Sequence, residues 1–116
     1  MQMTKDEFRS LAKLDKRTVT FAGKQIVVRT LSLNQKRAIR EDNMIFSIED
    51  GKPKQSINTE KFMVDTIVAS CVEPSFGDSD VDWMMNDSNG DFINELYSKI
   101  DSTVKLSDLD AKKSSS

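Results

Sequence analysis

The sequence predicts a small, mainly α-helical domain of the α+β class, with about five helices and one N-terminal β-hairpin. Two observations lead to this prediction. Apolar residues recur with helical spacing in two long segments, which begin near residues 59 and 91. Residues 18–30 instead contain two β-branched runs on either side of a glycine-bearing turn. A chain of 116 residues holds one domain with a modest core, which we place at residues 1–106.

The central helix is expected in the most apolar stretch of the chain, residues 59–76. Asn58 or Thr59 can accept hydrogen bonds from the first free amides of this helix. Pro74 stops it, because the residue before a proline is pushed out of the helical region. A broad apolar face, which suits a helix covered by several neighbours, is formed by Met63, Val64, Ile67, Val68, Cys71 and Val72.

Capping signals and a change of period define the elements before this helix. An N-cap Ser or Thr followed three residues later by Glu or Gln occurs twice, at Thr4 and at Ser32. Residues 44–48 either continue the second of these helices or form a short extended piece. The other expected elements are a helix over about 5–14, hairpin strands over 18–21 and 25–29, a helix over about 33–44 and a loop over 50–58.

The C-terminal third contains two further helices and a polar end. A short helix begins at Asp78 or Ser79, and the last helix covers about residues 91–105. From residue 107 the chain is polar, and we expect the tail 107–116 to be disordered. The last helix has the cleanest period, because an arc of about 140° holds Phe92, Ile93, Leu96, Tyr97, Ile100 and Val104.

The residue types that catalysis needs are scarce. The chain has no histidine, the usual general base and the commonest metal ligand, and its single Cys71 has no base beside it. The aspartates between residues 78 and 91 imitate a calcium loop. However, Trp83 occupies the place of its glycine and Asn89 that of its bidentate glutamate. We therefore expect no enzyme activity, no cofactor and no metal.

Charge and hydropathy argue against nucleic acid and membranes as partners of this chain. Residues 1–61 contain 13 basic and 8 acidic residues, whereas residues 62–116 contain 4 and 11. Lys36, Arg37 and Arg40 form the best basic patch, but a pI near 5.1 argues against nucleic-acid binding. No apolar run approaches the ~20 residues of a membrane span, and no signal peptide is evident. The expected compartment is the cytoplasm.

Bulky apolar side chains gather towards the C-terminal end. Trp83 adjoins two methionines in one short element, and methionine adapts to irregular partner surfaces. The competing interpretation is that the methionines fill gaps in a small core. The candidate residues for contact with a protein partner are Trp83, Met84, Met85, Phe92, Leu96 and Tyr97.

The order of several short motifs resembles a known family. A hairpin ending in residues 26–32 leads into a charged helix, and an apolar helix then ends in Cys71-Val72-Glu73-Pro74. Phe76 and the acidic stretch 78–82 follow, before a closing helix from Gly90 that leads to Leu106-Ser107. Over residues 19–107 this layout resembles the tail assembly chaperones of long-tailed bacteriophages.

The resemblance implies a small, mostly helical protein of the host bacterial cytoplasm. Its partners would be the tape measure protein, which it keeps soluble, and the tail tube subunits that it helps to recruit. A homo-oligomer is possible, and so is a longer frameshifted form made at Lys112–Lys113. Two other functions stay open: a permanent structural or adaptor protein of a phage tail or baseplate, and a small nucleic-acid-binding regulator.

Overall fold

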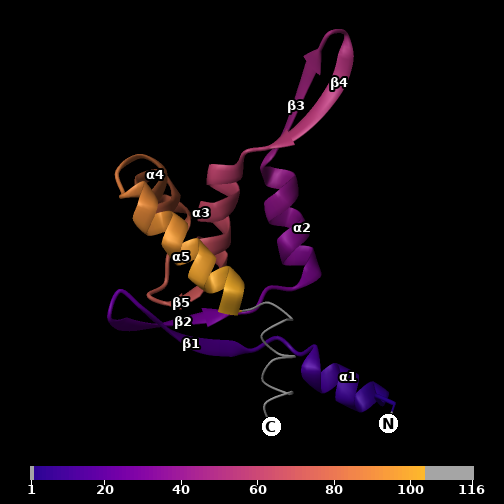
Figure 1. Ribbon diagram of the computed structural model, residues 1–116, viewed down its shortest axis with the longest axis vertical. Coiled ribbons are helices and arrows are strands. Elements are labelled where there is room, and N and C mark those ends of the chain that lie inside the picture. The colour runs from indigo at the N-terminus through magenta and orange to yellow at the C-terminus, as the bar shows by residue number, and fades with distance from the viewer. Residues whose placement is uncertain (1, 104–116) are drawn as a thin grey trace.

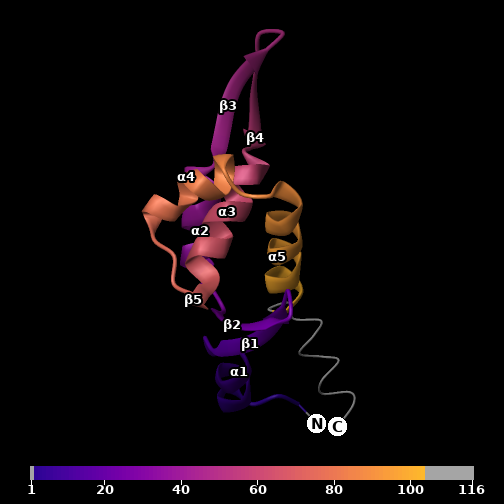
Figure 2. The ribbon, with the colours of Figure 1, turned by 90° about the vertical axis from the view of Figure 1, so that its left-hand side faces the viewer.

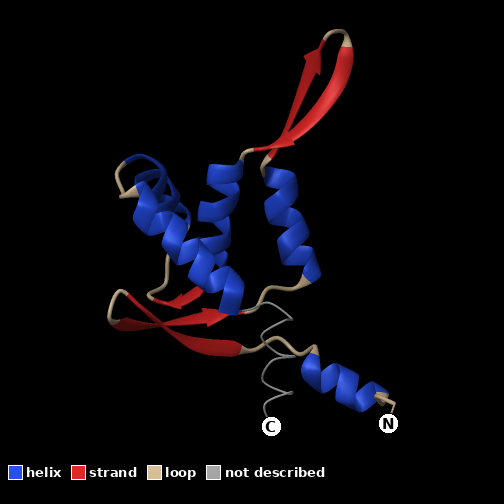
Figure 3. Ribbon diagram, viewed as in Figure 1, coloured by secondary structure: helices blue, strands red, loops and turns tan. Residues whose placement is uncertain are grey.

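The chain folds into a body of helices beside a small sheet. A second hairpin projects from the helices, at the end away from this sheet (Figures 1 and 3). The computed structural model describes residues 2–103, which contain five helices and five strands in an α+β arrangement. In chain order these are α1 (Lys5–Leu11), β1 (Lys16–Phe21), β2 (Lys24–Arg29), α2 (Leu33–Asp42), β3 (Met44–Glu49), β4 (Lys52–Ile57), α3 (Thr59–Ser70), β5 (Cys71–Glu73), α4 (Asp78–Asn86) and α5 (Gly90–Thr103).

The α+β class is confirmed, and the predicted N-terminal hairpin is found as β1 and β2, whose strands begin one or two residues earlier than expected. Its strands pair in antiparallel fashion, and Phe21 lies opposite Lys24 at the turn. Ala22 and Gly23 have φ angles of 54° and 77°, the left-handed values of a two-residue type I′ turn. The hairpin belongs to a three-stranded sheet in the order β1-β2-β5. The sheet therefore brings residues from both halves of the chain together.

The core is organised around α3, as its broad apolar face predicts. Val64 and Ile67 are buried, and α3 packs against α2, α4 and α5. The core cluster continues from α3 into the sheet and the two C-terminal helices. Its other members are Val19, Val28, Cys71, Met84, Ile93, Leu96 and Ile100.

α3 is shorter than the sequence predicts. The prediction ends this helix at Pro74, whereas the helix ends at Ser70 and β5 follows. The reason is a non-local contact, because β2 offers a strand edge and its Val28 pairs with Cys71. Strand hydrogen bonds thus replace those of a last helical turn that the proline already disfavours. Cys71 is buried in this strand.

The predicted helix starts are confirmed in detail. Thr4 Oγ1 accepts a hydrogen bond from the Glu7 amide at 3.1 Å. Ser32 forms a complete capping box, since its hydroxyl accepts from the Gln35 amide at 3.2 Å and Gln35 accepts from the Ser32 amide at 2.8 Å. α1 and α2 both end a few residues earlier than expected, whereas α4 and α5 begin close to their predicted starts. The predicted disordered tail, residues 107–116, lies outside the described residues.

The largest departure from prediction lies between α2 and α3. The sequence predicts a loop over 50–58, whereas residues 44–57 form the antiparallel hairpin β3–β4. This hairpin projects away from the helices in both views of the ribbon (Figures 1 and 2). The radius of gyration is 17.0 Å, whereas a compact chain of this length has about 13 Å. The described part of the chain is therefore extended, with a longest dimension of 53 Å.

Candidate partner-binding surface

The projecting hairpin is built on a tight turn with a regular register. Asp50 and Gly51, with φ angles of 53° and 76°, form a type I′ turn, and Glu49 faces Lys52 across it. Side chains alternate along each strand, so directly opposite residues share one face of the hairpin. The register therefore decides which side chains gather on each face.

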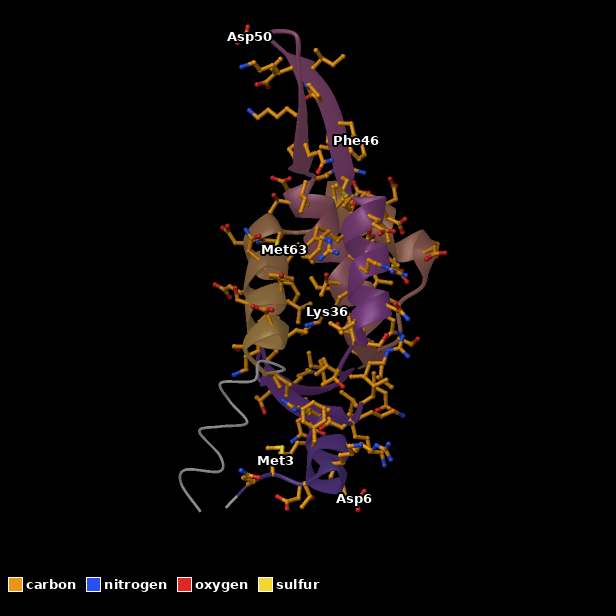
Figure 4. The ribbon with its side chains drawn as sticks, turned by 90° about the vertical axis from the view of Figure 1, so that its right-hand side faces the viewer. Met3, Asp6, Lys36, Phe46, Asp50 and Met63 are labelled. Atoms are coloured by element: carbon orange, nitrogen blue, oxygen red, sulfur yellow. The ribbon has the colours of Figure 1, made fainter. Side chains whose placement is uncertain are left out.

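One face of the hairpin consists of three cross-strand pairs, and we call it the apolar face: Met44–Ile57, Phe46–Gln55 and Ile48–Pro53. Phe46 and Ile48 are 70% and 77% exposed, so the described part of the chain leaves this face largely uncovered. Figure 4 shows Phe46 on the hairpin beyond the helices, with Asp50 at the tip. The opposite face carries an ion pair between Lys54 Nζ and Glu49 Oε2 at 3.0 Å.

Burial of the exposed side chains of this face against a partner would contribute favourable binding free energy. Full burial of an Ile or Phe side chain contributes about 1.5–3 kcal/mol. When this value is scaled by the exposed fractions, covering Phe46 and Ile48 would contribute about 2–4 kcal/mol. That amount favours a contact with another molecule but does not by itself make a tight complex.

A buried polar junction joins the hairpin to the helices. Asn43, which directly precedes β3, is 3% exposed, and its Nδ2 donates to Ile39 O at 2.8 Å and to Asp65 Oδ2 at 2.9 Å. Lys61 Nζ donates to the same carboxylate at 2.9 Å. Across the base of the hairpin, the Asn58 amide donates to the Asn43 carbonyl at 2.8 Å. These bonds hold the base of the hairpin against α2 and α3.

The six residues predicted to contact a partner do not form one surface. Met84 and Leu96 are 4% and 7% exposed and belong to the core, so we remove them from the candidate contact set. The burial of Met84 agrees with the competing interpretation, in which methionine fills the core. Trp83, Met85 and Phe92 are between 38% and 46% exposed. Trp83 and Met85 lie on different sides of α4, because residues two positions apart on a helix do not face each other.

Local contacts hold the two exposed aromatic rings of this set. The Trp83 indole Nε1 donates to Asp80 Oδ1 at 2.9 Å, and the Gly77 amide donates to the other carboxylate oxygen at 2.8 Å. These two hydrogen bonds, the indole bond above all, lower the pKa of Asp80 below its ordinary value. Phe92 packs edge-on against Phe21, with ring centroids 5.0 Å apart. Both rings are therefore held in place while part of each stays open to solvent.

Tyr97, the sixth predicted residue, is half-buried and lines a groove between α2, α3 and α5. The groove has a volume of about 200 Å³ and combines apolar with charged side chains. The predicted basic patch lies on the α2 side, where Figure 4 labels Lys36. The lining residues are Leu31, Lys36, Ile39, Arg40, Phe62, Thr66, Tyr97 and Asp101. This groove has room for one or two side chains of a partner.

The cysteine and the carboxylates of the described residues were the candidates for chemistry in the sequence. Cys71 is buried, which raises the pKa of its thiol to about 11 and keeps it protonated at neutral pH. Within residues 2–103, no three His, Cys, Asp or Glu side chains gather closely enough to hold a metal ion. No helix in this range combines the length and the apolar character needed to cross a bilayer.

The extended alternative for residues 44–48 is confirmed as β3, but sequence reasoning missed β4 and therefore the projecting hairpin, although a signal for it is present. Asp50-Gly51 is a favoured dipeptide for a type I′ turn, and residues 44–48 before it are rich in aromatic and β-branched side chains. Pro53 and its polar neighbours favoured the prediction of a loop. Pro53 is tolerated in β4 because its missing N–H lies on the outer edge of the strand.

Comparisons of the chain with protein-family models, with curated proteins and with solved structures gave no match. A functional conclusion for this chain therefore depends on its motifs and its geometry. The most distinctive geometric feature is the apolar face of the β3–β4 hairpin.

Proposed function

We propose that this chain is a tail assembly chaperone of a long-tailed bacteriophage. It binds the tape measure protein, keeps that protein soluble and helps to recruit tail tube subunits in the host cytoplasm. The order of motifs over residues 19–107 supports this function. The observation that carries the proposal is the apolar face of the projecting hairpin, where Phe46 and Ile48 are mostly exposed. Exposed apolar patches on small proteins commonly mark interaction sites.

The size of this surface favours reversible binding. A long helical tape measure protein exposes apolar stripes until tube subunits surround it. Covering Phe46 and Ile48 would contribute about 2–4 kcal/mol, whereas association itself costs at least about 4 kcal/mol. One hairpin therefore binds weakly, and stable coverage needs further contacts, such as Trp83 and Met85, or several chaperones on one client. Tube subunits can then displace the chaperone from the same stripes.

Co-expression with the tape measure protein tests this function. The expected result is that the chain moves the tape measure protein from the insoluble to the soluble fraction. Ile48→Ser, on the apolar face, should reduce the soluble fraction several-fold. Ile45→Ser is the matched control, because it makes the same change on the opposite face of the same strand.

Two outcomes of this experiment count against different parts of the proposal. A tape measure protein that is equally insoluble with and without the chain contradicts the chaperone function. Equal solubility with Ile48→Ser and Ile45→Ser contradicts the hairpin as the contact but leaves the function standing.

Mass spectrometry of purified particles separates this function from that of a permanent tail or baseplate component. A chaperone leaves before the tail is complete, so its peptides should be absent from mature particles. Detection of the chain in stoichiometric amounts would identify it as an adaptor instead.

A further inference from the structure

The two outer edges of the β3–β4 hairpin differ in their backbone groups. Glu49 and Lys52 close the type I′ turn, so their N–H and C=O groups point towards each other. The backbone groups of the next residue on β4, Pro53, therefore point to the outer edge. By the same alternation, three residues of β3 direct their N–H and C=O groups outward: Met44, Phe46 and Ile48.

The outer edge of β4 is protected against a further strand. Pro53 has no N–H at an outward position, and the exposed Lys52 and Lys54 flank it. Proline and lysine are residues by which natural edge strands resist pairing. β3 contains neither residue type, and among the described strands none pairs with its outer edge. One hairpin thus has one protected edge and one open edge.

The open edge is complementary to a second copy of itself. In an antiparallel pair centred on Phe46, the two Phe46 residues face each other and Met44 faces Ile48 of the second copy. Each of these three residues then exchanges N–H···O=C bonds with its partner, and no outward group between residues 44 and 48 is left over. A register displaced by two residues would place one of them opposite either the turn or the end of α2. The centred register also puts both apolar faces on the same side of a four-stranded sheet.

We propose that this chain dimerises by antiparallel pairing of β3 with β3 of a second copy. The area of the contact decides how stable the dimer is. β3 has six residues and is about 20 Å long, so edge pairing covers less than the ~800 Å² per partner of a stable interface. The dimer is therefore weak and forms reversibly with increasing concentration. This inference does not depend on the proposed chaperone function.

Sedimentation velocity over a concentration series measures this dimer in the full-length chain. Phe46→Lys and Phe46→Glu each place like charges opposite one another, which disfavours strand pairing, so each variant should remain monomeric. An equimolar mixture of the two variants should form a heterodimer, because opposite charges then face each other. Gln55→Lys is the matched control, since it adds charge to the same face but on β4, and it should dimerise like the wild type.

Disulfide capture provides a second measurement. Phe46→Cys places two thiols opposite each other with Cα atoms about 5.5 Å apart, within disulfide range. Gln55→Cys places its thiol on the protected strand, and the native Cys71 is buried. Mild oxidation should therefore cross-link Phe46→Cys several-fold more than Gln55→Cys.

Two results would overturn the proposal. The first is a wild-type chain that stays monomeric at every concentration, and the second is equal cross-linking of the two cysteine variants. Circular dichroism controls for folding, which the exposed position of Phe46 should leave intact.

Discussion

Two adjacent methionines of α4 should respond differently to the same substitution. Met84 is 4% exposed and belongs to the core, whereas Met85 is 38% exposed. Met84→Ala removes three buried heavy atoms, worth about 0.8 kcal/mol each, and leaves a cavity among packed helices, so we expect a loss of about 3 kcal/mol. Met85→Ala should cost about 1 kcal/mol or less, because its surroundings are partly solvent.

Urea unfolding followed by circular dichroism measures both changes. A difference of about 2 kcal/mol corresponds to roughly 10 °C in melting temperature for a domain of this size. Met84→Ala should still fold, because small domains are stable by about 5–15 kcal/mol. Met84→Leu, which nearly conserves volume, should recover most of the loss. Equal destabilisation by the two alanine variants would refute the orientation of α4 and with it the removal of Met84 from the contact surface.

Three further predictions follow from local contacts. NMR titration of Asp80 should give a pKa below the ordinary value of an aspartate, and Trp83→Phe should raise that pKa because the indole hydrogen bond is lost. The contribution of this carboxylate to stability is present near neutral pH and is lost as the pH falls through the folded-state pKa. The Cys71 thiol, with its pKa raised to about 11, should react with a thiol reagent at pH 8 only on unfolding. Asn43→Ala should cost about 1–3 kcal/mol in urea unfolding and reduce amide protection in β3 and β4, because the Asp65 carboxylate loses a donor.

Local signals in the sequence predicted the parts of the fold that local chemistry determines. The starts of α1 and α2 follow from caps that act over three residues, at Thr4 and Ser32. The end of α3 does not follow from a local signal, because β5 forms only where Cys71 pairs with Val28 of a strand more than 40 positions earlier in the chain. The β3–β4 hairpin carries a local signal in Asp50-Gly51, but the polar composition of β4 outweighed it.

The candidate surface was harder to predict than the fold, and the reason is general. Apolar side chains at helical spacing mark a buried face and a partner-binding face in the same way. Leu96 and Phe92 both belong to the regular apolar arc of α5, yet Leu96 is buried and Phe92 is half exposed. Only the arrangement of neighbouring elements decides which side chains are covered, and that arrangement depends on contacts distant in the sequence.

The apolar face of the hairpin adds little to the stability of the chain that carries it. A two-stranded hairpin is marginally stable alone, and here the turn at Asp50-Gly51 and the junction at Asn43 hold its two ends. Ile48 is 77% exposed, so Ile48→Ser should change the free energy of unfolding by no more than about 0.5 kcal/mol. The same substitution should weaken client binding or dimerisation several-fold. A large loss of stability would instead mean that the face is covered within the monomer, and the proposed client contact would lose its basis.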